Sequence, residues 1–225
     1  MVNKANAKRG LVRHIVILLL FSFSVAMKVS IETTWDNQPI DHQPAIIELQ
    51  SLHENDIQMN VEGTFFNDPP NPGGVPGEPF MGLWDFEVIE LFLANDANQY
   101  VEVELGPWGQ HIVLLLNGVH KTIRHSLPLR YKVLQRTEFG RWQGQAIIPA
   151  SYLPPNVTKM NAYAIHGSGA KRTYEALYPV PQGQFENPDF HRLDFFRPVN
   201  VSEFLAKPVT SFSTIWIESM ESANN

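Results

Sequence analysis

The sequence contains no cysteine among its 225 residues. This absence excludes disulfide bonds, thiolate metal sites and cysteine nucleophiles. A chain of this length with 44% hydrophobic residues can build its core without disulfides, so the absence does not indicate a compartment. One folded domain is the expected count.

Basic residues are also scarce outside the N-terminus. The chain has 17 Lys and Arg against 23 Asp and Glu, and four of the basic residues but no acidic residue lie in the first 26 positions. The remainder therefore has 13 basic and 23 acidic residues, a net charge of −10. An acidic surface repels phosphate backbones and anionic membranes, so nucleic acid is not an expected partner.

The N-terminal extension, residues 1–26, has the layout of a secretory signal peptide. Basic residues precede the apolar run 15–26, which is short for a membrane span, and Ser24-Val25-Ala26 resembles a cleavage site. An alternative start at Met27 explains the extension equally well, because a chain started there begins at the first predicted strand. Neither reading predicts a stable membrane anchor once the leader is cleaved or absent.

The localisation depends on which start is used. A start at Met1 predicts a secreted protein, whose sequons at Asn156-Val157-Thr158 and Asn200-Val201-Ser202 would make it a candidate glycoprotein. A start at Met27 predicts a cytoplasmic protein. Glycosylation of the sequons separates these two readings.

Short β-type runs dominate the remaining sequence, and long helical periodicity is lacking. Seventeen prolines and 14 glycines lie between the runs, which is typical of an all-β layer architecture. Strands are expected at 29–35, 45–49, 57–62, 88–93, 100–105, 112–117, 129–136, 141–149, 160–166 and 173–177, and helical turns at 150–153 and 201–206. We therefore predict an all-β, antiparallel, jelly-roll-like β-sandwich over residues 27–206, followed by a C-terminal tail at 207–225.

Turn and loop signals separate the predicted strands. Residues 95–98 and the pair Asn117-Gly118 are typical of hairpin turns. Residues 67–79 contain five prolines and three glycines, which excludes regular structure there. A loop of this length is either functional or a plain surface excursion, and the sequence leaves both open.

The alternation in residues 100–105 assigns each side chain to one face of its strand. The two valines and the leucine at the odd-numbered positions point to the core, whereas Tyr100, Glu102 and Glu104 share the opposite face. Because these glutamates recur along one face, they need an explanation beyond folding.

Further polar and aromatic residues are expected near this glutamate face. Glu87 and Glu90 lie on the preceding strand, and His111 opens the next one, close to the face if the strands form a meander. Carboxylates accept hydrogen bonds from sugar hydroxyls, and Trp84 and Trp108 can stack on a sugar ring. The alternative to a binding face is a solvated sheet face, on which the glutamates contact water and the tryptophans cover a core edge. Catalysis also stays open.

Paired carboxylates additionally suggest a glycan- or ester-directed hydrolase. Glycosidases use an acid and a base or nucleophile at a defined separation, but four glutamates allow too many pairs for spacing to select one. A histidine, His111 or His166, would complete such a site. A third alternative is a scaffold whose sandwich edge contacts another protein.

A second polar cluster occupies residues 164–178. Its Gly-Ser-Gly turn lacks the Gly-Lys-Ser of a phosphate loop, and no Gly-x-Ser-x-Gly elbow surrounds Ser168. His166 at a strand end is more typical of a structural histidine than of a ligand or base, and Arg172 can pair with the glutamate face.

The eight histidines show no metal-ligand spacing, so no metal ligand and no cofactor are predicted. His120 and His125 are interpreted as surface residues that flank a turn. A hard-cation site of the Ca²⁺ type stays open, since carbonyl and carboxylate ligands leave little sequence trace.

Several long runs carry a resemblance to a known family. They are residues 83–92, 100–105, 109–111, 152–159, 164–167, 171–172 and 174–181. These runs resemble an animal protein family whose human member is named for an open reading frame on chromosome 4, and the resemblance covers residues 27–196. The chain departs from the family pattern at Gly106 and Trp108, which weakens a binding role for Trp108.

A more distant resemblance concerns Glu87-Val88-Ile89-Glu90-Leu91-Phe92, which, with the tyrosine-led strand after it, is similar to family 9 carbohydrate-binding modules. That resemblance implies a carbohydrate-binding-module-like sandwich, a saccharide or glycan partner and no catalytic residue. Together with the residue patterns it gives these ligand-binding candidates: Trp84, Glu87, Glu90, Glu102, Glu104, His111, His166, Arg172 and Tyr174.

Overall fold

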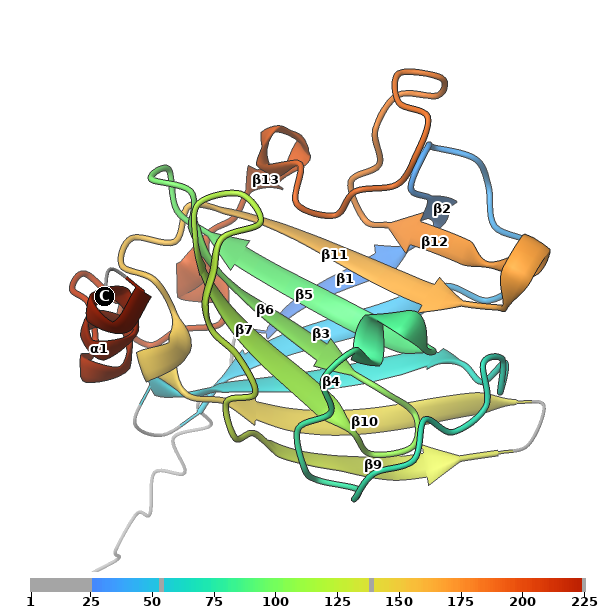
Figure 1. Ribbon diagram of the computed structural model, residues 1–225, viewed down its shortest axis with the longest axis horizontal. Coiled ribbons are helices and arrows are strands. Elements are labelled where there is room, and N and C mark those ends of the chain that lie inside the picture. Colours follow the sequence, from blue (N-terminus) through green and yellow to red (C-terminus); the bar gives the residue numbers. More distant parts are fainter. Residues whose placement is uncertain (1–25, 53–54, 138–139, 224–225) are drawn as a thin grey trace, which may run out of the picture.

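The computed structural model describes residues 26–52, 55–137 and 140–223, which form two antiparallel sheets packed face to face (Figure 1). The predicted all-β sandwich is confirmed. The signal-peptide-like segment 1–26 lies outside the described residues, apart from its last residue. Within the described part of the chain, no helix has the length and hydropathy that a membrane crossing requires.

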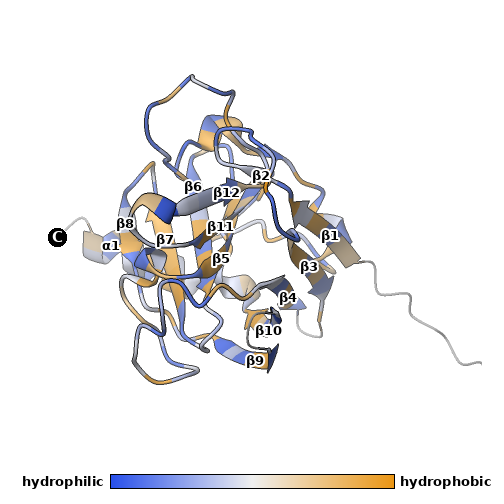
Figure 2. Ribbon diagram, turned by 90° about the vertical axis from the view of Figure 1, so that its right-hand side faces the viewer, coloured by the Kyte–Doolittle hydropathy of each residue, from blue (hydrophilic) through white to orange (hydrophobic). Residues whose placement is uncertain are grey.

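The smaller sheet has five strands. Its order is β1 (Ala26–Ile31), β3 (Ala45–Ser51), β4 (Ile57–Thr64), β10 (Arg141–Ile148) and β9 (Arg130–Arg136). In Figure 2 these strands run down the right-hand side and along the bottom of the molecule. Buried and partly exposed residues alternate along β4 and β10, as expected for a sheet with one face on the core and one toward water.

The larger sheet has eight strands. Its order is β2 (Thr33–Thr34), β12 (Thr173–Ala176), β11 (Lys159–His166), β5 (Val88–Ala94), β6 (Gln99–Leu105), β7 (His111–Asn117) and β8 (Thr122–Arg124), with β13 (Arg197–Pro198) beside β11. All seven residues of β5 are buried. This sheet is therefore covered on both faces.

Two apolar layers explain that burial. The main core fills the space between the sheets and includes Leu91, Val101 and Val103. A second apolar cluster lies on the other side of the larger sheet and includes Phe92 and Leu193. We call the side facing the main core the inner face of the larger sheet, and the opposite side its outer face.

The helical elements are short. The 3₁₀ helices are η2 (Leu83–Asp85), η3 (Ala150–Tyr152), η4 (Gly169–Lys171), η5 (Leu193–Phe195) and η6 (Val201–Glu203). The one described α-helix, α1 (Thr214–Ala223), lies beside β8 and η3 (Figure 2). Its Trp216 is fully buried in the main core and donates a hydrogen bond to the carbonyl of Tyr152 over 3.0 Å.

The structure thus corrects the expectation of a separate tail at 207–225. This segment carries α1, whose indole ring completes one end of the core. The other predicted strands and the turns at residues 95–98 and 117–118 are confirmed, but the single strand expected at 29–35 is divided into β1 of the smaller sheet and β2 of the larger sheet. The short strands β8 and β13 were not expected. Two- and three-residue strands are too short for an alternating pattern to identify them.

The proline-rich loop at 67–79 is tied to the corner between β6 and β7. Gly77 N donates to the Gly109 carbonyl and Gln110 Nε2 donates to the Gly73 carbonyl, each over 2.8 Å. Gly109 has a φ of 99°, and a Cβ there would lie 2.8 Å from the Pro76 side chain. Only glycine allows the loop to approach the corner this closely.

Candidate functional site

A groove of about 720 Å³ lies on the outer face of the larger sheet. Its floor is formed by side chains of β5, β6, β7 and β11: Glu90, Glu102, Leu114, Leu116 and Ile165. Its walls come from the η2 segment, the β12 strand, the β7–β8 turn and the loop around Pro188–His191. Segments far apart in the sequence therefore meet over one sheet face.

Aromatic side chains form one wall of the groove. Trp84 lies on η2 and is 40% exposed, and Tyr174 of β12 lies near it. Arg172 connects the two elements, because its guanidinium donates to the carbonyls of Trp84 and Asp85 and stands 5.5 Å from the centre of the Tyr174 ring. Arg172, which lies in the connection between β11 and β12, thereby fixes the backbone position of Trp84.

Three glutamates cross the sheet beneath this wall. Glu90 of β5 is the direct cross-strand partner of Glu104 of β6, and Glu102 lies two residues along the same strand. All three are less than 5% exposed, so the alternative of a solvated glutamate face is wrong. Among the described residues, no hydrogen-bond partner reaches Glu90 Oε1, Glu102 Oε2 or either carboxylate oxygen of Glu104.

Burial raises the pKa of each of these carboxyl groups, since surroundings of low dielectric disfavour the charged form. The pKa of Glu102 rises to about 7. The pKa values of Glu90 and Glu104 rise well above their usual range, first through burial and then through the charge of neighbouring carboxylates. At neutral pH Glu90 and Glu104 therefore retain protons and Glu102 is partly protonated, so the floor offers hydroxyl donors as well as oxygen acceptors.

Two histidines and an aspartate extend the polar floor. His120 Nε2 lies 3.2 Å from Asp189, His191 Nε2 lies 4.0 Å from Glu102, and His191 Nδ1 lies 2.7 Å from the Tyr100 hydroxyl. Burial, reinforced by the charge of His120, lowers the pKa of His191 to about 4, so this ring is neutral at physiological pH. Its two nitrogens then provide one donor and one acceptor.

These residues were missed by sequence reasoning. His191 and Asp189 lie in a loop without periodicity, and no repeating pattern in the sequence indicates that this loop covers the sheet. His120 is exposed, as predicted, and so is His125, yet both line the groove. The clue available in the sequence was the pair of aromatic residues, Phe190 and Phe196, which anchor the loop in the outer apolar cluster.

The predicted site residues divide among three places. Trp84, Glu90, Glu102, Arg172 and Tyr174 line the groove, and Glu104 is buried beside its floor. The expectation that His111 lies close to the glutamate face is wrong. His111 is paired with Leu105 in the β6–β7 ladder and packs near Tyr131 of the other sheet, so it points to the inner face.

Burial lowers the pKa of His111 to about 4, which keeps this ring neutral inside the sandwich. Trp108 is also remote from the groove. It packs against the main core, with Phe65 beside it and the Arg136 guanidinium 3.5 Å from its ring centre. The resemblance that weakened a binding role for Trp108 agrees with this structural position.

Glu87 and His166 lie on the inner side of the larger sheet, where β5 begins and β11 ends. Both border a small cavity of about 20 Å³. Backbone N–H groups of Phe66 and Asn67 donate to the Glu87 carboxylate, but burial outweighs these bonds and raises its pKa to about 8. The same cavity is bordered by His42 and Glu175.

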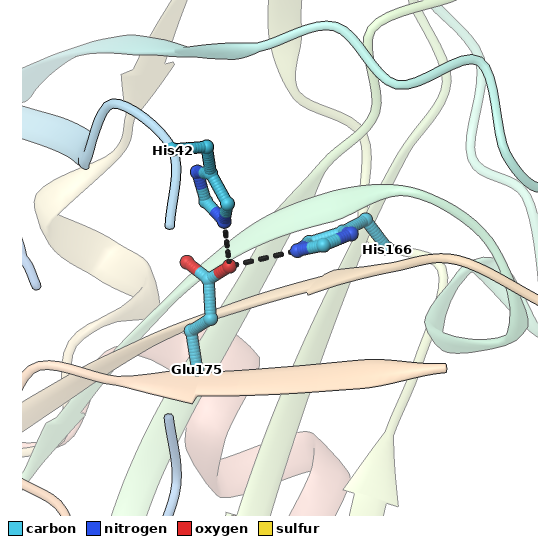
Figure 3. Close-up of side chains that lie close together, drawn as sticks. All are labelled: His42, His166 and Glu175. Carbon is cyan, nitrogen blue, oxygen red and sulfur yellow. Dashed lines mark hydrogen bonds and ion pairs between the residues drawn. The ribbon is translucent and has the colours of Figure 1, made fainter. Parts of the chain in front are cut away.

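His42, His166 and Glu175 form a compact cluster at this cavity (Figure 3). His42 Nε2 and His166 Nε2 each lie 2.8 Å from the same atom, Glu175 Oε1. The hydrogen bond to Glu175 raises the pKa of His42. Burial pushes the pKa of Glu175 upward, but the bonds from the two rings outweigh it and the pKa is lowered.

Comparisons with known proteins define the relatives of this chain. No family model matches it. The UPF0462 protein C4orf33 homologue of Danio rerio is 47% identical over 195 residues, which are 84% of this chain and 98% of that protein. The human UPF0462 protein C4orf33 is 48% identical over 185 residues, 80% of this chain and 92% of that protein. The chain belongs to the UPF0462 family.

The UPF0462 homologue of Mus musculus shows the same likeness, with 48% identity over 80% of this chain. The family resemblance expected from the sequence is confirmed. The alignments cover 98% of the Danio rerio protein and 92% of the human protein, so this UPF0462 chain matches nearly the full length of both relatives.

One solved structure shares the fold of this UPF0462 chain, and a second gives a weaker superposition. A candidate carbohydrate-binding protein from Bacteroides uniformis superposes with a TM-score of 0.52 at 15% identity, over 76% of this chain and 84% of that one. A family 9 carbohydrate-binding module from Caldicellulosiruptor kristjanssonii, solved with cellotriose, gives a TM-score of 0.38 at 12% identity. At this identity the Bacteroides structure shows the shared fold alone.

Proposed function

We propose that the chain binds a neutral saccharide in the groove on the outer face of the larger sheet, without catalysing a reaction. One observation carries the proposal. A single groove combines an exposed tryptophan with buried carboxyl groups, and among the described residues several of their oxygens have no hydrogen-bond partner. The carbohydrate-binding-like fold supports it.

The aromatic wall suits the apolar faces of a sugar ring. Trp84 and Tyr174 offer ring surfaces, and the contacts of Arg172 hold both in place before any ligand arrives. Stacking on a tryptophan that is already held in position costs little conformational entropy. This wall would therefore supply much of the affinity.

The floor suits the hydroxyl groups of the same ring. Glu90 and Glu102 are buried polar groups with unpartnered oxygens, and such groups carry a desolvation cost that a ligand hydroxyl relieves. Glu90 retains its proton at neutral pH and Glu102 is partly protonated, and in the protonated form each can donate to one hydroxyl and accept from another. His191 adds a further donor and acceptor.

The charge of the groove favours a neutral ligand. Its lining holds the acidic residues Asp85, Glu90, Glu102 and Asp189, while the Arg172 guanidinium is already bound to backbone carbonyls. Uronic acids and sulfated sugars would meet repulsion chiefly from the two aspartates, because burial raises the pKa values of Glu90 and Glu102 and so reduces their negative charge. We therefore expect neutral oligosaccharides to bind and anionic ones to be rejected.

Binding of the full chain to a glycan array, followed by calorimetry on each hit, tests the proposal. Trp84→Ala should weaken binding of a neutral saccharide by about tenfold to a hundredfold. Loss of a ligand ring stacked on an aromatic side chain costs about 1–3 kcal/mol when the ligand is a nucleic-acid base, and we expect a similar loss for a sugar ring. Glu102→Gln should weaken it less, because the amide retains a donor and an acceptor.

Leu134→Ala is the matched control, because Leu134 is an exposed apolar residue on the smaller sheet. Its binding should equal that of the parent chain. If no neutral saccharide binds across a broad array, or if Trp84→Ala and Leu134→Ala bind equally well, the groove is not a saccharide site.

A hydrolase is the second candidate, favoured by the pKa of Glu102. A carboxyl with a pKa near 7, next to other carboxyl groups in a groove, has the protonation that a general acid requires. Hydrolysis of chromogenic glycosides or esters by the full chain, abolished in Glu102→Gln, would support this candidate. A uniformly inert panel would remove it.

A further inference from the structure

We infer that His42, His166 and Glu175 form a binding site for a divalent first-row transition ion such as Zn²⁺, with one coordination position open to the adjacent cavity. The inference is independent of the saccharide proposal, because this cluster lies on the inner side of the larger sheet and the groove lies on its outer face. Four separate features of the cluster support it.

The first feature is the convergence of the donor atoms. Figure 3 shows both imidazole rings directing their Nε2 atoms at one carboxylate oxygen of Glu175. One ligand atom from each of the three residues lies within 4.8 Å of the other two. Ligand bonds of about 2.0–2.2 Å place tetrahedral donors roughly 3.4 Å apart, so an opening of the 2.8 Å contacts by about half an ångström would admit the ion.

The second feature is the support of the rings. His42 Nδ1 lies 3.0 Å from the carbonyl of Gln43, which accepts its N–H, so Nε2 is the nitrogen that would exchange its hydrogen bond to Glu175 for a bond to the ion. A backbone carbonyl behind a histidine is the usual outer-shell partner of a metal ligand. The ring of His166 stacks on Phe66 at 3.6 Å and 4°, which fixes its plane.

The third feature is the burial of the charge. The Glu175 side chain is 1% exposed, and those of His42 and His166 are 16% and 12% exposed. A carboxylate so deeply buried needs hydrogen-bond donors or a positive charge beside it, and a bound cation would supply that charge. Two imidazoles and one carboxylate suit Zn²⁺ and its first-row neighbours, whereas Mg²⁺ and Ca²⁺ prefer oxygen ligands.

The fourth feature is the space next to the cluster. The cavity of about 20 Å³ exceeds the roughly 10–15 Å³ that one water molecule needs. Three protein ligands with such a space leave room for an exchangeable fourth ligand, the arrangement of an open zinc site. Glu87 borders the same cavity and would face that ligand.

Metal analysis of the full, untagged chain tests the inference. After removal of metals by a chelator and re-equilibration with Zn²⁺, mass spectrometry of the dialysed protein should find about one ion per chain. Replacement of Zn²⁺ by Co²⁺ should give the visible absorption bands of a low-symmetry nitrogen–oxygen site. Neither Mg²⁺ nor Ca²⁺ in tenfold excess should displace the bound ion.

Three substitutions locate the ion. His42→Gln, His166→Gln and Glu175→Gln should each lower zinc affinity by about a hundredfold or more, since even outer-shell changes cost tenfold to a hundredfold. Glu175→Gln keeps the shape of the side chain, and its circular dichroism should match that of the parent chain. Glu186→Gln changes an exposed carboxylate outside both the cluster and the groove and should leave the affinity unchanged.

The groove offers a rival set of donors in His120, His191 and Asp189, so His191→Gln is also measured. Retention of zinc in His191→Gln supports the cluster. Zinc that is lost in His191→Gln but retained in His42→Gln, binding equal in all variants, or less than about one tenth of an ion per chain would each overturn the inference. In the last case the cluster is a hydrogen-bonded triad held by protons alone.

Discussion

Both faces of strand β6 are buried, but the inner face is apolar and the outer face carries carboxyl groups. On the inner face Val101, Val103 and Leu105 are fully buried in an apolar core. On the outer face Glu102 and Glu104 are 4% and 0% exposed, yet their surroundings leave several carboxylate oxygens without a partner. An apolar interior stabilises a fold, whereas unpartnered buried carboxyl groups destabilise it, so the outer face serves another purpose.

Moving a carboxyl group from the outer face to the inner face should have the largest effect. Val103→Glu places a carboxyl group in the apolar main core and should cost more than about 4 kcal/mol of unfolding free energy. Chemical denaturation followed by tryptophan fluorescence measures the loss. Glu104→Gln is the paired outer-face change and should leave the chain folded. Equal stability of Val103→Glu and its parent would mean that the two faces do not differ as described.

Truncation of neighbouring residues on β5 compares the two apolar layers directly. Leu91 points to the inner face and Phe92 to the outer face, and both are fully buried. Leu91→Ala should cost about 2–5 kcal/mol and Phe92→Ala about 3–5 kcal/mol. Urea denaturation of both variants measures these losses. A cost below about 1 kcal/mol for Phe92→Ala would show that the outer layer is a loose cover rather than a second core.

The pH dependence of stability should sharpen the comparison with a smaller effect. The pKa of Glu102 is about 7 in the folded chain against a usual 4.5, so between these values the folded state retains a proton that the unfolded state has lost. Stability therefore falls as the pH rises through this window and levels off above the folded pKa. Glu102→Gln should reduce this fall, since Glu87, Glu90 and Glu104 still contribute to it, and should stabilise the chain by about 1–3 kcal/mol at pH 8, with little change at pH 4.

Thermal melts at pH 4, 6 and 8 measure this difference. Glu32→Gln, at an exposed position on the connection between β1 and β2, is the control and should follow the parent chain at each pH. If Glu102→Gln is less stable than the parent at pH 8, the Glu102 carboxylate is stabilised by a partner that the fold provides, and the outer face is not strained.

Much of the fold follows from the sequence, because alternation is a local property. Residues 100–105 could be assigned to faces correctly, since the side chains of a strand alternate regardless of what surrounds it. The burial of Glu102 could not be predicted. It depends on the loop that carries Phe190 and His191, and this loop has no pattern that ties it to the sheet.

The remaining site residues were hidden for a different reason. His42 and Glu175 are 133 positions apart and come together only through the pairing of β2 with β12 and the path of the loop that follows β2. Metal-ligand motifs are recognised by short spacings, which a sandwich need not use. Residues 207–225 were predicted to be a C-terminal tail. They contain the ten-residue helix α1, whose Trp216 packs in the main core.

The four residues of β12 also limit how this part of the chain can change in evolution. Tyr174 is paired with Ile165 at the groove, and its neighbour Glu175 is paired with Ala164 on the inner face. A single-residue insertion or deletion in the preceding turn would exchange these faces, sending a carboxylate into the groove and a phenol ring into the cluster. Insertions and deletions should therefore be absent from the 167–173 turn among functional relatives. The proline-rich loop at 67–79 can vary in length wherever its backbone contacts to the β6–β7 corner are kept.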